Sequence, residues 1–144
     1  MIKRILAAAA LSALSLAAAS AGPVADRQAG MKVRAAQMKV LAPMAQGKAP
    51  FDAEAANAAF ARLAEEARTA DVQAYYPDGS HSGDTSAAPA IWEDLEAFVA
   101  ANESYAASVA AAAAAAPADL GSFRAAFGEV ARHCGACHQD YRTK

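Results

Sequence analysis

Apolar residues recur at helical spacing over four stretches of this chain, and no stretch shows the strict alternation expected of a β-strand. Two short links and one long connection, residues 71–88, join the stretches, a pattern typical of an all-α antiparallel four-helix bundle with up-down-up-down order. The predicted helices run from about Val24 to Ala45, from about Asp52 to Ala70, from about Pro89 to just before Pro117, and from about Leu120 to Arg142.

Each predicted helix has one face suited to the bundle interior, and the abundance of alanine favours helix throughout. Asp52 and Asp119 are expected as N-caps, and Pro43 is expected to bend or loosen the last turn of the first helix. Met38 and Met44 are expected to fill the core. The inner positions are Met31, Ala35, Met38, Ala42 and Ala45, with Leu41 beside them; Ala56, Phe60, Leu63 and Ala67; Ile91, Leu95, Phe98, Asn102, Tyr105 and Val109; and Phe123, Phe127, Val130, Cys134, Cys137, His138 and Tyr141.

Residues 134–138 read Cys-Gly-Ala-Cys-His, which is the C-x-x-C-H signature of covalent c-type haem attachment. Two thiols add to the porphyrin vinyl groups as thioethers, and the adjacent histidine supplies an imidazole nitrogen to iron. A redox-active C-x-x-C normally opens a helix after a strand, and a structural zinc site needs four ligands, so both fit this chain poorly. The motif predicts one haem c, attached to Cys134 and Cys137 and axially ligated by His138.

The N-terminus has the pattern of a secretory signal. Lys3 and Arg4 precede an apolar stretch over residues 5–19, and residues 19–21 match a small-x-small cleavage site. We therefore expect a cleaved leader over residues 1–21. Because c-type haem is attached outside the bacterial inner membrane, the leader and the C-terminal motif both predict a periplasmic protein.

The rest of the chain, residues 22–144, fits one domain with its own core. The whole chain has 13 basic and 15 acidic residues, a formal charge of −2. Loss of two basic residues with the leader makes the formal charge about −4, before haem propionates are counted. No basic stripe suits nucleic acid, and no stretch after the leader is long and apolar enough to span a membrane. We therefore expect no binding to nucleic acid or membrane.

A C-x-x-C-H in the last turns of a terminal helix resembles the cytochrome c′ family, and the resemblance extends along most of residues 22–144. It departs from the family at Gly135, where lysine is frequent, and at Tyr75 and Tyr76, where many members carry a tryptophan. The matching segments are Arg27-Gln28 with Met31 on the first helix, residues 49–52 before the second, residues 83–85 and 89–92 before the third, and residues 123–128 and 134–142 on the last.

The resemblance implies roles for side chains around the haem. Arg27 would pair with a propionate, Gln28 would donate to the same propionate, and Arg142 would lie beside the proximal imidazole. The residue types alone also allow Arg27 as a solvated helix charge and Arg142 as a terminal arginine that stabilises the helix dipole. The resemblance further implies a homodimer formed through the first two helices.

Met31 lies on the distal side of the haem by the same resemblance, and two outcomes follow. If the thioether only packs over the iron, the iron is five-coordinate and high-spin; if sulfur binds, the protein is a low-spin His/Met electron carrier. We favour the open site, which would bind NO and, more weakly, CO, and would exchange single electrons with periplasmic partners. The first helix has no His or Tyr beside Met31, so we expect an apolar distal face and no peroxidase-like enzyme activity.

Overall fold

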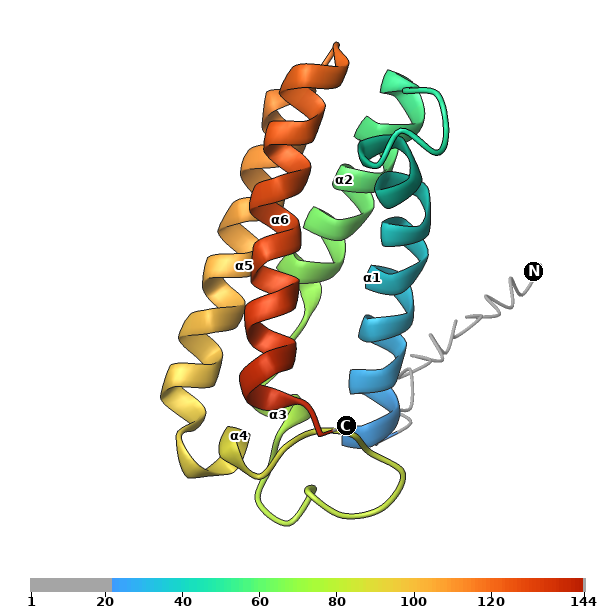
Figure 1. Cartoon of the computed structure of the whole chain (residues 1–144). Coiled ribbons are helices and arrows are strands. Elements are labelled where there is room, and N and C mark those ends of the chain that lie inside the picture. Colours follow the sequence, from blue (N-terminus) through green and yellow to red (C-terminus); the bar gives the residue numbers. More distant parts are fainter. Residues whose placement is uncertain (1–21, 144) are drawn as a thin grey trace, which may run out of the picture.

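The computed structural model describes residues 22–143, and within them four long helices form the antiparallel bundle that the sequence predicted (Figure 1). The predicted leader, residues 1–21, lies outside the described residues. The long connection lies at the end of the bundle where the first helix begins and the last one ends. The helices are α1 (Pro23–Ala45), α2 (Ala53–Thr69), α3 (Val72–Tyr75), α4 (Ala90–Glu93), α5 (Leu95–Ala115) and α6 (Leu120–Tyr141).

Aspartate side chains begin four of the helices by accepting backbone N–H groups that lack a partner within the helix. Asp52, Asp71 and Asp94 each accept from the N–H three residues later, at 3.0, 3.0 and 2.9 Å. Asp94 has non-helical backbone angles, φ −146° and ψ 78°. The prediction of one continuous helix from Pro89 was therefore wrong, because the chain turns at Asp94 and its carboxylate caps a new helix, α5.

The bundle is closed by burial of apolar side chains from all four long helices, which form what we call the main core. A second, smaller core centred on Tyr76, Ile91 and Phe98 lies beside the long connection. Among the described residues, no helix combines the length and hydrophobicity needed to cross a bilayer. The buried residues of the main core are Leu41, Met44, Ala56, Ala59, Phe60, Leu63, Ala67, Tyr105, Val109, Ala112, Phe123 and Val130.

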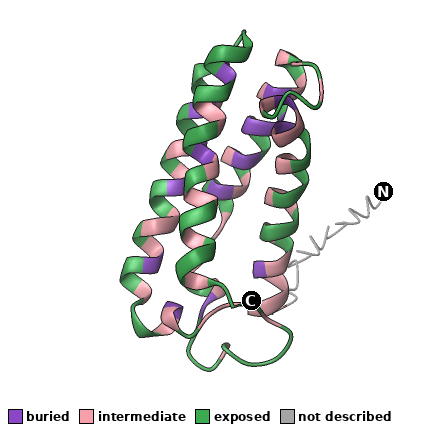
Figure 2. Cartoon of the chain, viewed as in Figure 1, coloured by how far each residue is buried: buried purple, intermediate pink, exposed green. Residues whose placement is uncertain are grey.

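The predicted inner face of α2 is confirmed, whereas that of α1 is partly wrong. Met44 is buried and Met38 packs against the main core, as expected of core methionines. Met31 and Ala35 are exposed, because the buried positions of α1 lie near its two ends (Figure 2). Leu41 is fully buried rather than beside the inner face. The middle of α1 therefore contributes little to the main core.

His138 is the one expected inner position of α6 that is exposed, whereas Phe123 and Val130 are fully buried. α6 accordingly packs tightly at its N-terminal half and more loosely near its C-terminus. Cys134 and Cys137 lie in this looser part and are half-buried.

Replacing a side chain of the main core should destabilise the bundle strongly. Leu63 is 1% exposed, so we expect Leu63→Ala to lower the free energy of unfolding by about 2–5 kcal/mol through lost burial and a residual cavity. Urea unfolding followed by far-ultraviolet circular dichroism measures this loss. Leu120→Ala is the matched control, because Leu120 is 36% exposed and its truncation should change stability by about 0.5 kcal/mol or less. Equal losses in the two variants would contradict this description of the core.

The cap of α6 should make stability depend on pH. Asp119 accepts the backbone N–H of Ser122 at 3.0 Å, its hydroxyl at 2.9 Å and the N–H of Gly121 at 2.8 Å, and these bonds lower the pKa of Asp119. A carboxyl whose pKa falls on folding stabilises the protein above its unfolded pKa, about 3.9, and loses that effect as the pH falls through its folded pKa.

We therefore expect Asp119→Ala to destabilise the protein at pH 7 and to differ less from the wild type as the pH is lowered below about 4. Thermal unfolding of both proteins over a pH series measures the difference. A difference that is independent of pH would show that the carboxylate does not provide the cap.

Candidate functional site

The last turns of α6 present both cysteines toward the rest of the protein. Cys134 packs against the main core and Cys137 against the second core, so the two thiols lie where the cores adjoin. Both cysteines are free. Burial raises the pKa of each thiol, and the positive charge of Arg34 opposes this rise in both. Both thiols are therefore protonated at neutral pH. A protonated thiol is a poor nucleophile, which argues against a disulfide-exchange site.

His138 follows directly and lies at the surface of α6. Partial burial lowers the pKa of this imidazole, and the positive charges of Arg142 and Arg34 act in the same direction. A neutral imidazole keeps a nitrogen lone pair available for a metal. Arg142 is thus close enough to His138 to affect it, and its backbone pairs with Ala87 in an isolated antiparallel bridge to the long connection.

Arg27 is buried, only 6% exposed, near the N-terminus of α1. Its guanidinium donates to the backbone oxygen of Ser80 at 2.9 Å, to the hydroxyl of Ser80 at 3.2 Å and to the backbone oxygen of Tyr75 at 3.4 Å. It also lies over the rings of Tyr76 and Trp92, 4.8 and 5.6 Å from their centroids. The alternative of a solvated helix charge is therefore wrong.

Arg27 nevertheless has spare capacity for an anion. Its Nε is buried without a hydrogen-bond partner, and no carboxylate within residues 22–143 forms an ion pair with its guanidinium. Burial of an uncompensated positive charge is costly unless an anion pairs with it. Arg27 is also connected to the second core, because Tyr76 contacts its guanidinium and belongs to the core against which Cys137 packs.

Gln28 is half-buried beside Arg27, and its Nε2 donates to the backbone oxygen of Asp84 at 2.8 Å. Both side chains singled out for carboxylate recognition thus fasten the connection of residues 71–88 to α1. Met31, one turn further along α1, is 38% exposed and belongs to neither core.

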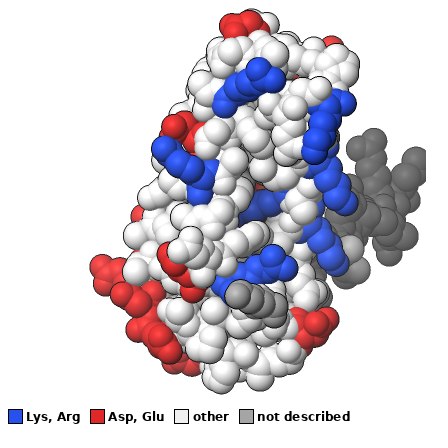
Figure 3. All heavy atoms as spheres, viewed as in Figure 1, with Lys and Arg blue, Asp and Glu red and all other residues white. Residues whose placement is uncertain are grey.

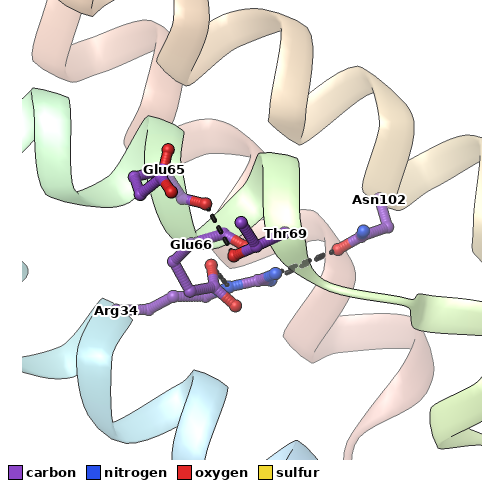
Figure 4. Close-up of polar contacts among 5 residues, drawn as sticks. All are labelled: Arg34, Glu65, Glu66, Thr69 and Asn102. Carbon is purple, nitrogen blue, oxygen red and sulfur yellow. Dashed lines mark hydrogen bonds and ion pairs between the residues drawn. The ribbon is translucent and has the colours of Figure 1, made fainter. Parts of the chain in front are cut away.

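The sequence reasoning missed a polar network inside the bundle, centred on Arg34 (Figure 4). Arg34 Nε lies 2.7 Å from Glu66 Oε2 of α2, and both Arg34 terminal nitrogens lie 3.3 Å from Asn102 Oδ1 of α5. The guanidinium stacks 4.4 Å from the ring centroid of Tyr105, whose buried hydroxyl has no hydrogen-bond partner. Arg34, three residues after Met31 on α1, therefore adds a charged side chain next to the position where an apolar distal face was expected.

A signal for this network was present in the sequence. Asn102 occupies an inward position of the predicted third helix, and a buried amide requires a hydrogen-bond partner from a neighbouring element. Arg34 also follows Arg27 by seven residues, which is two helical turns on the same face of α1. The partner could not be identified from these spacings alone, because Glu66 adjoins Glu65 and their carboxylates point in different directions.

These residues fit a haem. The thiols are half-buried and free, a neutral imidazole adjoins them, apolar side chains of both cores surround them, and Arg27 is a buried cation without an anion. Within the described part of the chain, no cluster of three or more His, Cys, Asp or Glu residues is arranged to hold a bare metal ion. Figure 3 shows Lys and Arg gathered along α1 and its boundary with α6, whereas Asp and Glu gather beside α4 and α5. On the face drawn in Figure 3, the positive charges therefore lie along α1 and along its boundary with α6.

Comparisons with known proteins agree with this assignment. The sequence profile of the family described as Cytochrome C′ matches residues 22–142. Cytochrome c-556 of Agrobacterium tumefaciens (strain II Chrys) is 38% identical over 124 residues, which cover 86% of this chain and 99% of the relative. Cytochrome c′ of Cereibacter sphaeroides is 35% identical over 99% of each chain. The structure of cytochrome c′ from Rhodopseudomonas palustris matches with a TM-score of 0.78 and 32% identity, over 87% of this chain and 98% of that one.

The space around Gly30 offers a test of the Arg34–Glu66 ion pair. A Cβ added at Gly30 would lie 2.8 Å from Glu66 Oε1, whereas one added at Gly128 of α6 would meet nothing within 4 Å. Alanine normally stabilises a helix interior by about 0.5–1 kcal/mol relative to glycine. We therefore expect Gly128→Ala to raise stability by this amount and Gly30→Ala to lose the gain, because the carboxylate must move away from Arg34.

Urea unfolding of both variants and of Gly30→Ala combined with Glu66→Ala measures this effect. In the Glu66→Ala background, the alanine at position 30 should become stabilising, since the obstructing carboxylate is gone. A stabilising Gly30→Ala in the otherwise wild-type protein would contradict the close approach of Glu66 to α1.

Proposed function

This chain belongs to the cytochrome c′ family, whose members carry covalent c-type haem, and we propose that it is a periplasmic member that binds NO and CO at five-coordinate iron. In this proposal the leader, residues 1–21, is removed and residues 22–144 form one domain. The protein exchanges single electrons with periplasmic redox partners and performs no catalytic turnover of its own.

Cys134 and Cys137 form the thioethers and His138 provides the axial nitrogen. The observation that carries this assignment is the pair of free, half-buried thiols on one face of α6, with a neutral imidazole directly after them. When bound, the haem supplies an iron centre that cycles between ferric and ferrous states and accepts a diatomic ligand. The helix holds all three side chains in fixed register, so attachment at the thiols presents the imidazole to the iron.

Arg27 and Gln28 bind the propionates. Support comes from the unpaired Nε of Arg27, from the absence of a carboxylate partner for it among residues 22–143, and from its contact with Tyr76 beside Cys137. A guanidinium can serve two groups at once, since it carries five N–H donors. Arg142 lies on the proximal side, where its charge adds to the effect of partial burial in lowering the pKa of the neighbouring imidazole.

An open sixth position is supported by the distribution of possible ligands. His81 packs edge-to-face against Trp92, with ring centroids 5.7 Å apart, and His133 is half-buried on α6. The guanidinium of Arg34 is occupied by Glu66 and Asn102. Ligands that need little help from a hydrogen-bond donor, NO and CO, therefore suit this pocket.

A second candidate function is a low-spin electron carrier with Met31 as the sixth ligand. One observation favours it: of the methionines of α1, Met38 and Met44 are engaged in the main core, whereas Met31 is 38% exposed and free of both cores. A thioether that is not committed to packing is available to bind iron.

Absorption spectra of the ferrous protein with and without CO distinguish the two functions. We expect high-spin bands that shift on addition of CO, one haem per chain by mass spectrometry, and no covalent haem after Cys134→Ala combined with Cys137→Ala. Met31→Ala should leave the spin state unchanged, and Met38→Ala is the matched control on the same helix.

Low-spin bands that CO does not alter, and that disappear in Met31→Ala but persist in Met38→Ala, would instead establish the electron carrier. A colourless wild-type protein of bare-chain mass, from a host competent in c-type haem attachment, would refute both functions.

Pairing of two copies through α1 and α2 is also part of the proposal. It is supported by the exposed apolar side chain of Val40 on α1, which is 38% accessible in the single chain. Sedimentation velocity of the haem-loaded protein measures it, and a monomer at tens of micromolar concentration would refute it.

A further inference from the structure

The ion pair between Arg34 and Glu66 is largely buried and, together with Asn102, joins three helices. The two side chains are 16% and 11% exposed, and the amide of Asn102 on α5 completes the arrangement. The other two ion pairs of residues 22–143 join neighbours on one helix surface: Arg68 with Glu65, and Arg132 with Glu129. Well-packed apolar side chains often replace a buried ion pair without loss of stability, so stability alone does not explain its presence here.

The pair has a defined direction with respect to α6. The carboxylate of Glu66 lies against α1, 2.8 Å from the position of a Cβ at Gly30. The guanidinium stacks on Tyr105, which belongs to the main core together with Cys134. The guanidinium therefore contacts a side chain of the core against which Cys134 packs.

The electrostatics of α6 agree with this direction. Burial has the largest effect on these groups, raising the pKa of Cys134 and Cys137 and lowering that of His138. The positive charge of Arg34 lowers the pKa of each as a smaller contribution, whereas Glu66 contributes to none of the three. The side chains expected to hold the haem thus experience the guanidinium more strongly than its partner carboxylate.

We propose that Arg34 and Glu66 act as an opposed pair that sets the haem reduction potential, with Arg34 favouring the ferrous state and Glu66 the ferric state. The inference rests on the haem attachment proposed above. Reduction transfers one electron from an external one-electron donor and removes one positive charge from the iron centre. Arg34 stabilises the state that holds the extra electron by Coulomb attraction, and Glu66 opposes it by repulsion.

Two charge-removing variants, studied as haem-loaded proteins by spectroelectrochemical titration, test this proposal. Arg34→Gln should move the midpoint potential to more negative values, because it leaves the carboxylate of Glu66 uncompensated. Glu66→Gln should move it to more positive values, because it leaves the guanidinium uncompensated. Each shift should be on the order of a tenfold change in the reduction equilibrium, which for one electron is about 59 mV.

The opposite signs separate the proposal from a structural role. If the pair only holds the helices together, both variants loosen the bundle, admit water to the haem and move the midpoint potential in the same, negative direction. Shifts of the same sign, or no shift beyond that of the control, would overturn the proposal. Arg68→Gln is the matched control, because it removes an arginine from the ion pair of α2 with Glu65, whose side chains are 71% and 53% exposed.

Arg34→Lys is the conservative variant and should keep most of the wild-type potential, because it retains the positive charge although it loses the planar fork. A potential as negative as that of Arg34→Gln would count against a charge effect. Covalent haem is measured by mass spectrometry on every protein. Its absence from the wild type would refute the proposed function together with this inference, whereas same-sign shifts in haem-loaded proteins would refute the inference alone.

Discussion

The arrangement of the site depends on one constraint, the register of α6. A helix places residues three and four apart on one face. The burial of Phe123 and Val130 in the main core therefore also fixes the direction in which Cys134 and Cys137 point. The two thiols cannot be turned outward without removing those side chains from the core. The same helix therefore serves as the last structural element of the bundle and as the holder of the haem attachment motif.

A second group of side chains connects the site to the long connection of residues 71–88. Arg27 and Gln28 hold this connection from α1, while the backbones of Ser86 and Ala88 pair with Thr143 and Tyr141 at the end of α6. Donors and acceptors from both ends of residues 22–143 thus converge on one irregular segment. Polar contacts therefore position that segment together with the burial of Tyr76 in the second core.

The sequence was sufficient for the fold, because helical spacing of apolar residues in α2 and α6 is regular and aspartates at their starts have a clear physical role. It was less informative about α1, where Met31 is exposed and Arg34 points inward. Periodicity assigns a charged residue such as Arg34 to the surface, but the ion pair with Glu66 compensates its charge inside the bundle. The break at Asp94 was missed for a similar reason. In the sequence, an aspartate that caps a helix and an aspartate exposed to solvent can occupy the same position of the apolar pattern. Only the backbone angles distinguish the two.

The two ends of the bundle differ in how many fully buried side chains they contain, and this difference affects which end opens first. Where α1 meets α2 and α5 meets α6, fully buried side chains such as Leu41, Phe60 and Phe123 must be exposed before backbone amides can exchange with water. At the opposite end, the buried apolar side chains belong to the smaller second core, and several hydrogen bonds that fasten the connection lie at the surface. Local unfolding therefore begins at this end and costs less than global unfolding. A chain that opens at this end while the opposite half stays folded exposes the last turns of α6, where Cys134 and Cys137 lie.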